Sequence, residues 1–156
     1  VVIDLGGGYG SDTYEHLIEN EVEVYGYKGS KTAPMRSKDS NIPFLNTRSA
    51  AVWRMREALD PSQPGGSTIA LPDDPELVAD LTAPTYEIKN NVIRVEPKDK
   101  VCERLGRSTD KGDAVMMAWF QGAKDANSAL EWIDQRQAQK KRGQSPKVIS
   151  GRHNRR

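Results

Sequence analysis

The opening stretch of the chain, VVIDLGGGYG, constrains the fold more than any other. Its first five residues, Val1–Leu5, are apolar apart from one acid, which predicts a buried strand that ends in a glycine-rich turn. The spacing of apolar residues then predicts a helix over about 11–19, and alternation predicts a second strand over 21–27. A strand, a helix and a strand in this order predict a right-handed parallel unit, and therefore an α/β domain.

The rest of the chain divides into helices and a hairpin. In chain order we expect a loop over 28–41, a helix from its cap Asn46 to about Leu59, an exposed and mobile connection over 60–66, a short strand over 67–74 and a helix over 75–81. A hairpin of Tyr86–Lys89 and Val92–Glu96 around Asn90 and Asn91 follows, and then helices over about 111–122 and 127–141. Residues 143–156 are expected to form a basic, disordered tail, so the folded domain is expected to cover residues 1–142.

The composition is that of a soluble globular protein, with 29% charged residues, 36% hydrophobic residues and a net charge of +1. No apolar run approaches the length of a membrane span. The lone Cys102 excludes an internal disulfide framework and a CxxC metal site, so a reducing, cytoplasmic setting is expected. The near-neutral charge argues against a surface that binds nucleic acid everywhere, although residues 135–156 carry basic side chains and no acid.

Two acids stand three residues apart in GRSTDKGDAVMMAW, directly before an apolar helical stretch. Asp110 and Asp113 would share one face of that helix, and they would meet Asp4 if this helix packs beside the first strand. Three carboxylates suit Mg²⁺ or Mn²⁺, and two such ions about 4 Å apart support in-line hydrolysis of a phosphodiester. The alternative is that the two acids only cap the helix and face solvent.

Asp4 lies at the carboxyl end of the predicted first strand, where open parallel sheets place their ligands. The alternative is that its carboxylate only accepts the amides of the following turn. The spacing of Asp4, Gly6, Gly8 and Gly10 also resembles the first motif of S-adenosylmethionine-dependent methyltransferases. That family has an acid at the end of the next strand, where this chain has Gly26, Tyr27 and Lys28. No GxxxxGK[ST] phosphate loop occurs.

Three stretches in order resemble the C-terminal nuclease domain of the large terminase subunit of tailed bacteriophages, a ribonuclease-H-like fold. They are VVIDLGGGYGSDTYEHLIEN, PFLNTRSAAVWRMREAL and VIRVEPKDKVCERLGRSTDKGDAVMMAW, and they cover most of the chain up to about Phe120. The resemblance implies a mixed sheet flanked by helices, with a hairpin insertion. Because the family's first acid comes from an earlier strand, we expect this chain to lack the first strands of the fold and the ATPase motor.

The resemblance also implies roles for four residues. Asp4 would be the second catalytic acid and Asp113 the last, both as metal ligands, with Asp110 as an auxiliary acid beside the metals. Lys98 would face the scissile phosphate or support a carboxylate. The implied reaction is hydrolysis of concatemeric double-stranded DNA by two Mg²⁺ or Mn²⁺ ions, which we expect to be weak or absent in this chain alone.

The implied partners are double-stranded DNA and, in the full-length protein, the portal protein and the small terminase subunit, without a membrane and in the host cytoplasm. On a nuclease, Arg48, Arg54 and Arg56 would line a path for the DNA backbone. Two other functions stay open. One is a methyltransferase that uses the DLGGGYG turn, and the other is a non-catalytic module that binds DNA or a partner through the basic tail.

Overall fold

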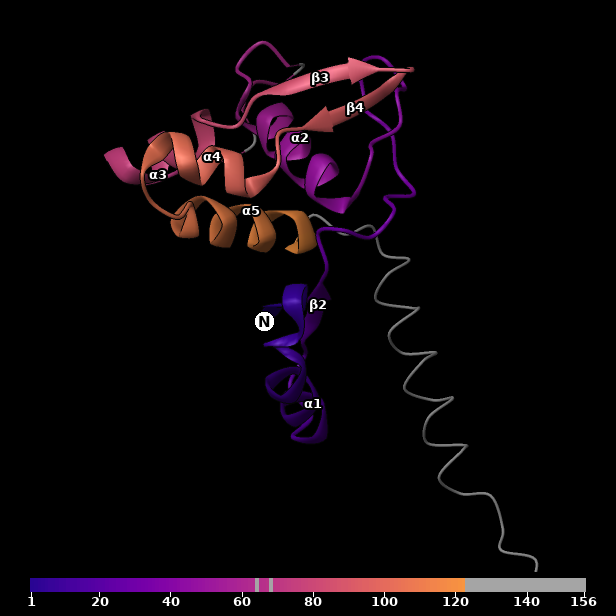
Figure 1. Ribbon diagram of the computed structural model, residues 1–156, viewed down its shortest axis with the longest axis vertical. Coiled ribbons are helices and arrows are strands. Elements are labelled where there is room, and N and C mark those ends of the chain that lie inside the picture. The colour runs from indigo at the N-terminus through magenta and orange to yellow at the C-terminus, as the bar shows by residue number, and fades with distance from the viewer. Residues whose placement is uncertain (64, 68, 123–156) are drawn as a thin grey trace, which may run out of the picture. The chain divides into compact units, whose positions relative to one another are not determined.

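Figure 1 shows the computed structural model of the chain, which describes residues 1–63, 65–67 and 69–122. The predicted helix over 127–141 and the predicted tail over 143–156 lie outside the described residues. Within the described part, no helix combines the length and the apolar character that a membrane crossing requires.

The opening of the chain forms the predicted parallel unit. Strand β1 (Val2–Asp4) leads through a short turn, η1 (Gly6–Gly8), into helix α1 (Ser11–Glu19), and strand β2 (Tyr25–Tyr27) then pairs with β1 in parallel. Strand β2 is shorter than predicted because a turn after α1 takes up the first residues of the predicted strand. There, Glu21 has φ 61° and its N–H bonds the carbonyl of Ile18. The α/β class and the parallel pairing are therefore confirmed.

Helix α2 (Thr47–Leu59) begins at the predicted cap, because the Asn46 side chain accepts the N–H of Ser49. The helix is buried on two sides. Ala50 and Trp53 belong to one apolar cluster with Ile93, whereas Ala51 and Met55 belong to a second cluster with Met116. Helix α2 thus lies between the hairpin and the last described helix, as Figure 1 shows.

The predicted hairpin is confirmed as strands β3 (Tyr86–Lys89) and β4 (Val92–Val95), which pair antiparallel. Asn90 and Asn91 at its turn have φ 54° and 58°, the left-handed conformation that asparagine tolerates and that tight hairpins require. In the described part of the chain, the parallel and the antiparallel pairings form two separate two-stranded sheets rather than one mixed sheet.

Three helices complete the described fold: α3 (Pro75–Thr82), α4 (Lys98–Leu105) and α5 (Asp110–Gly122). The strand predicted over 67–74 is wrong for its described residues, since none of them pairs in a ladder and the Ser67 hydroxyl bonds the carbonyls of Ala58 and Ile69 instead. Helix α4 was not predicted. Only Val101 is buried in it, so its apolar signal is weak, although Pro97 before it and Gly106 after it mark its ends.

A bidentate ion pair makes the stability of the fold depend on pH. Arg104 donates to both Glu96 carboxylate oxygens, at 2.8 and 2.9 Å, and Thr85 donates to one of them. These bonds, with that from Arg104 the largest effect, lower the pKa of Glu96 from 4.5 to about 2. A carboxylate with a depressed pKa stabilises the fold above its unfolded pKa, so this contribution is lost as pH falls from about 4.5 to about 2.

We therefore expect the urea midpoint of the wild type to fall over that pH range more steeply than that of Glu96→Gln. Glu87→Gln on the exposed strand β3 is the matched control and should follow the wild type. Equal slopes for all three proteins would show that the pair with Arg104 does not stabilise the fold.

Candidate active site

A cavity of about 390 Å³ opens beside the carboxyl ends of β1 and β2. Its lining residues come from these strands, from the turn η1, from the loop after β2, from the starts of α2 and α4 and from the first two turns of α5. Three of the four residues predicted from the sequence line it, namely Asp4, Lys98 and Asp113. The fourth, Asp110, lies one helical turn before Asp113 and is not part of the lining. The fold thus brings together acids from the two ends of the described chain.

Asp4 ends strand β1 and is exposed. Its Oδ1 accepts the N–H of Gly6 at 2.8 Å, so the turn amide occupies one carboxylate oxygen and Oδ2 has no hydrogen bond to a described residue. The turn needs a glycine at position 10, where an added Cβ would lie 2.3 Å from the carbonyl oxygen of Asp4. The glycines therefore fix the path of the backbone directly behind this acid.

Lys98 joins the two acids of α5. Its Nζ lies 2.7 Å from Asp113 Oδ2 and 3.6 Å from Asp110 Oδ1. The Asp113 side chain is 19% exposed, whereas that of Asp110 is 81% exposed, so Asp113 is the acid held inside the fold. Thr109 also donates to Asp113 Oδ2, at 3.0 Å.

The pKa values of Lys98 and Asp110 are shifted by these contacts. Burial acts to lower the pKa of Lys98, but its bond to Asp113 and the charges of Asp113 and Asp110 outweigh burial, so the pKa is raised. The pKa of Asp110 is lowered, first by the hydroxyl of Ser108, which donates to it, and then by the charge of Lys98. Lys98 therefore remains an ammonium ion beside ionised Asp110 at neutral pH.

Asp110 and Asp113 do not cap α5, because a different acid accepts a backbone amide at the start of this helix. Asp80 of α3 accepts the N–H of Gly112, in the first turn of α5, at 3.0 Å. The close approach needs a glycine, since a Cβ at position 112 would lie 2.6 Å from the Asp80 Cβ. None of the described hydrogen bonds joins a backbone amide at this helix start to the carboxylate of Asp110 or Asp113.

Asp80 was missed by the sequence reasoning, although a signal was present. An acid stands between Leu77 and Leu81 on the apolar side of α3, where a buried charge needs a partner. Arg107 supplies it, with Nη1 2.5 Å from Asp80 Oδ1. The start of α5, and with it Asp113, is thus held in place from α3.

The donor chemistry of the site fits a hard divalent cation, because its acids offer carboxylate oxygens. The Lys98 ammonium already stands where a cation faces both Asp110 and Asp113. Among the described residues, no group of three or more His, Cys, Asp or Glu side chains is close enough to hold a metal ion. Asp4 shares the cavity with Asp113 without forming such a group.

Tyr27 and Arg48 also line the cavity, although the sequence reasoning did not place them there. Tyr27 is 5% exposed, and its hydroxyl has no hydrogen-bond partner among the described residues. Burial raises the pKa of Tyr27, and the charges of Asp113 and Asp4 add to this, while that of Arg48 opposes it. Arg48 donates to the carbonyl of Glu96 at 2.6 Å.

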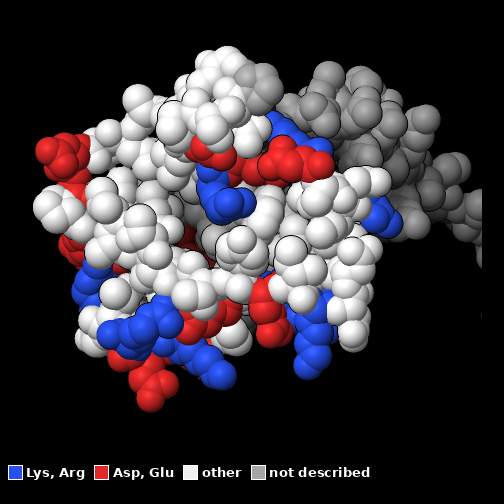
Figure 2. All heavy atoms as spheres, turned by 90° about the horizontal axis from the view of Figure 1, so that it is seen from above, with Lys and Arg blue, Asp and Glu red and all other residues white. Residues whose placement is uncertain are grey.

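The three arginines of α2 do not form one path. Arg48 lines the cavity, but Arg54 pairs with Glu57 at 2.9 Å and the Arg56 guanidinium lies over the ring of Trp53 at 4.7 Å. On the face shown in Figure 2, Lys and Arg side chains alternate with Asp and Glu instead of gathering in one basic field. Any contact with DNA on this face would therefore be local.

Comparison with solved structures identifies the fold. The nuclease domain of the large terminase subunit gp2 of bacterial virus Sf6 matches with a TM-score of 0.54 and 20% sequence identity, covering 74% of this chain and 62% of that domain. A lysine-to-alanine variant of the same domain matches with manganese (TM-score 0.52, 22% identity, 74% of this chain and 63% of that one) and with manganese and beta-thujaplicinol (TM-score 0.53, 19% identity, 74% and 62%).

No protein-family model matches the chain, and no curated protein matches it. The chain spans about 62% of the length of the Sf6 domain. The structural matches agree in fold with the resemblance seen in the sequence. The chain therefore shares its α/β fold with the nuclease domain of a phage terminase large subunit.

Proposed function

We propose that this chain is part of a metal-dependent nuclease that hydrolyses double-stranded DNA during the packaging of a phage genome. One observation carries the proposal: Asp4 of β1 and Asp113 of α5, far apart in the sequence, line one cavity together with Lys98. The similarity to a terminase nuclease domain, of which a variant is described with manganese, supports it.

The acids and Lys98 would have different roles in this reaction. Asp4 and Asp113 would hold Mg²⁺ or Mn²⁺, and Asp110 would assist from the edge of the cavity. A pair of such ions, when bound, supplies Lewis-acid stabilisation of the attacking and leaving oxygens of a phosphodiester. Lys98 would turn from the carboxylates toward a phosphate of the DNA, since its side chain is 44% exposed and already lies at the cavity.

The setting of the protein is part of the same proposal. Double-stranded DNA would be its substrate, and the portal protein and the small terminase subunit would be partners of the full-length protein in the host cytoplasm. The nuclease domain would extend over residues 1–142, followed by a basic tail over 143–156.

Binding of Mn²⁺, followed by electron paramagnetic resonance, tests the proposal directly. We expect Asp4→Asn and Asp113→Asn each to weaken Mn²⁺ binding by about tenfold or more, because each removes a charged oxygen ligand. We expect Lys98→Met to strengthen it by roughly tenfold, or about 1.4 kcal/mol, because a competing cation is removed. Asp73→Asn changes an exposed acid outside the cavity and is the matched control.

Two parallel measurements separate the alternatives. Relaxation and linearisation of plasmid DNA in Mn²⁺, with the same variants, report whether the bound ion supports hydrolysis. Binding of S-adenosylmethionine without metal would instead favour a methyltransferase. Mn²⁺ affinities that are equal in the wild type, Asp4→Asn and Asp113→Asn would contradict the nuclease proposal.

A further inference from the structure

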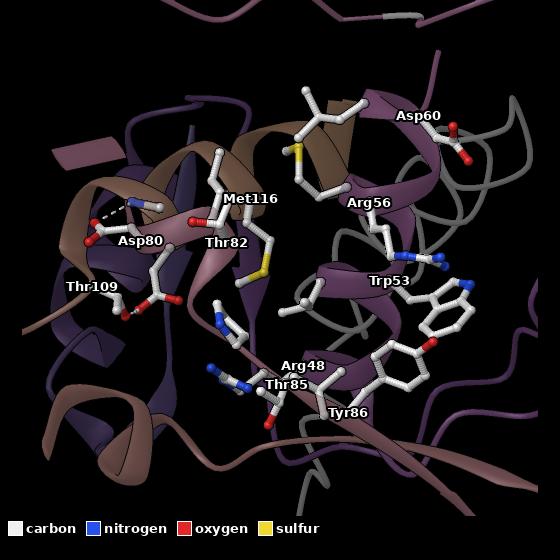
Figure 3. Close-up of a pocket in the computed structure, with 18 residues that line it drawn as sticks. Arg48, Trp53, Arg56, Asp60, Asp80, Thr82, Thr85, Tyr86, Thr109 and Met116 are labelled. Carbon is white, nitrogen blue, oxygen red and sulfur yellow. Dashed lines mark hydrogen bonds between the residues drawn. The ribbon is translucent and has the colours of Figure 1, made fainter. Parts of the chain in front are cut away.

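A second cavity, of about 560 Å³, lies between α2, α5, the hairpin and the segment that joins α3 to β3. It shares Arg48, Asp113 and Met116 with the candidate active site and is otherwise lined by different residues. Figure 3 shows Trp53, Tyr86 and Arg56 along one side of this cavity, with Asp80 and Thr109 along the opposite side. Its volume is that of a typical site for a small organic molecule.

Apolar and aromatic side chains form most of the wall. The aliphatic and sulfur-containing residues are Val52, Met55, Leu59, Leu81, Val95 and Met116. Beside them, the rings of Trp53 and Tyr86 meet edge to face, with centroids 4.8 Å apart. Such a wall favours a ligand with a flat apolar part, which can pack on methyl groups and ring edges.

The acids in the wall are already partnered. Asp80 pairs with Arg107 and accepts the N–H of Gly112, and Asp113 pairs with Lys98. Asp60 accepts both the N–H and the hydroxyl of Ser62. Asp80 and Asp113 therefore add little uncompensated negative charge to the cavity, whereas Asp60 keeps its charge at the edge of the cavity near Arg56.

Neither of the two arginines in the wall forms an ion pair with an acid among the described residues. Among the described residues, Arg48 bonds a neutral carbonyl, that of Glu96, and has no carboxylate partner. Arg56 lies over the rings of Trp53 and Tyr86, at 4.7 and 5.8 Å, and forms no ion pair with a described carboxylate, although its charge acts weakly on Asp60. The cavity thus combines an apolar interior with two arginines whose charge an anion would complement.

We propose that this cavity binds an aromatic anion, with its ring against the apolar wall and its acidic group at Arg48 and Arg56. Two sources share this chemistry: a free aromatic acid, and a nucleotide with its base in the cavity and its phosphate at the arginines. The proposal does not depend on metal binding or on nuclease activity, so it can fail or succeed separately from both.

The test uses the whole chain and the fluorescent aromatic anion 8-anilinonaphthalene-1-sulfonate. We expect saturable binding of one dye per chain, with unchanged near-ultraviolet circular dichroism, since the dye also binds loosened folds. Arg48→Met and Arg56→Gln should each weaken binding by about tenfold, the effect of losing one charge-assisted contact. Leu81→Trp, which fills the cavity, should abolish it.

Lys89→Met is the matched control, because it removes one positive charge from an exposed strand outside the cavity. It should bind the dye as the wild type does. If Leu81→Trp does not fold, Arg56→Gln still tests the proposal. Arg56 lies on the exposed side of α2, so its replacement should leave the fold intact. The proposal is overturned if all variants bind the dye equally, if Lys89→Met weakens binding as much as Arg56→Gln, or if binding does not saturate at one dye per chain.

Competition then identifies the source of the anion. Displacement of the dye by 1-naphthoate and not by thymidine 5′-monophosphate would assign the cavity to free aromatic acids, and the reverse result would assign it to nucleotides. Displacement by inorganic phosphate as effective as that by either aromatic compound would overturn the proposal, because the apolar wall would then contribute nothing.

Discussion

Replacement of Asp80 by alanine is expected to lower the free energy of unfolding by about 3 kcal/mol, a large part of the stability of a domain of this size. The Asp80 side chain is 0% exposed and pairs with Arg107, and its other oxygen accepts the N–H of Gly112. Alanine would leave the guanidinium with only the half-exposed Glu76 as an acid partner and a buried amide without its acceptor. Arg107 is 34% exposed and regains some water, which places the loss at the lower end of the range for broken buried pairs.

Urea unfolding of Asp80→Ala, Asp80→Asn and Glu76→Ala measures this effect. Asn keeps an acceptor for the amide and loses the charge, so it should fall between the wild type and alanine. Glu76 lies on the same helix and also faces Arg107, at 3.5 Å, but it is 46% exposed, so its loss should cost less than about 1 kcal/mol. A loss for Asp80→Ala no greater than that for Glu76→Ala would show that the buried pair does not hold α3 to α5.

Replacement of Gly10 by alanine is expected to cost about 3 kcal/mol and to move the acid of β1. The new Cβ would lie 2.3 Å from the carbonyl oxygen of Asp4 and 2.7 Å from Ile3 Cγ2. The first of these atoms belongs to the backbone, so the clash cannot be relieved by a side-chain rotation. The strand must shift, and the carboxylate at its end must shift with it.

Gly8→Ala provides the matched comparison, because a Cβ there meets no described atom within 4 Å but φ is 86°. It should cost about 1 kcal/mol, the penalty of a left-handed conformation alone. Thermal unfolding gives the two losses of stability, and Mn²⁺ binding shows whether Asp4 has moved. Equal losses for the two variants would mean that the turn relaxes around Gly10 without displacing β1.

The local patterns of the sequence predicted most of the described fold. Residues 1–27, the cap at Asn46 and the turn at Asn90 and Asn91 each carry a signal that depends only on neighbouring residues, and the structure confirms them. Helix α4 has a weak apolar pattern and local signals only at its ends, Pro97 and Gly106. The described residues after 66 form no strand because Ser67 bonds the carbonyl of Ala58, a contact that no local pattern encodes. Helix α5 is also less buried than its apolar sequence suggests, since only Gly112 and Met116 are buried among its residues from 110 to 120.

The site was predictable to a similar extent. Asp4, Lys98 and Asp113 were named from motifs, and the structure places them around one cavity, while their roles remain predictions. The pairing of Lys98 with both acids, the support from Asp80 and the burial of Tyr27 follow from tertiary contacts between separate elements. Spacing along the chain carries no information about such contacts.

The position of Lys98 affects which ions can compete for the carboxylates of Asp110 and Asp113. A lysine on a neighbouring helix is a counter-ion that cannot diffuse away, and its effective concentration at Asp113 is set by the fold rather than by the buffer. Monovalent salt therefore competes poorly with it, whereas a divalent ion or a phosphate that attracts the ammonium elsewhere can displace it. The two acids are thus shielded from one another until a ligand of sufficient charge arrives.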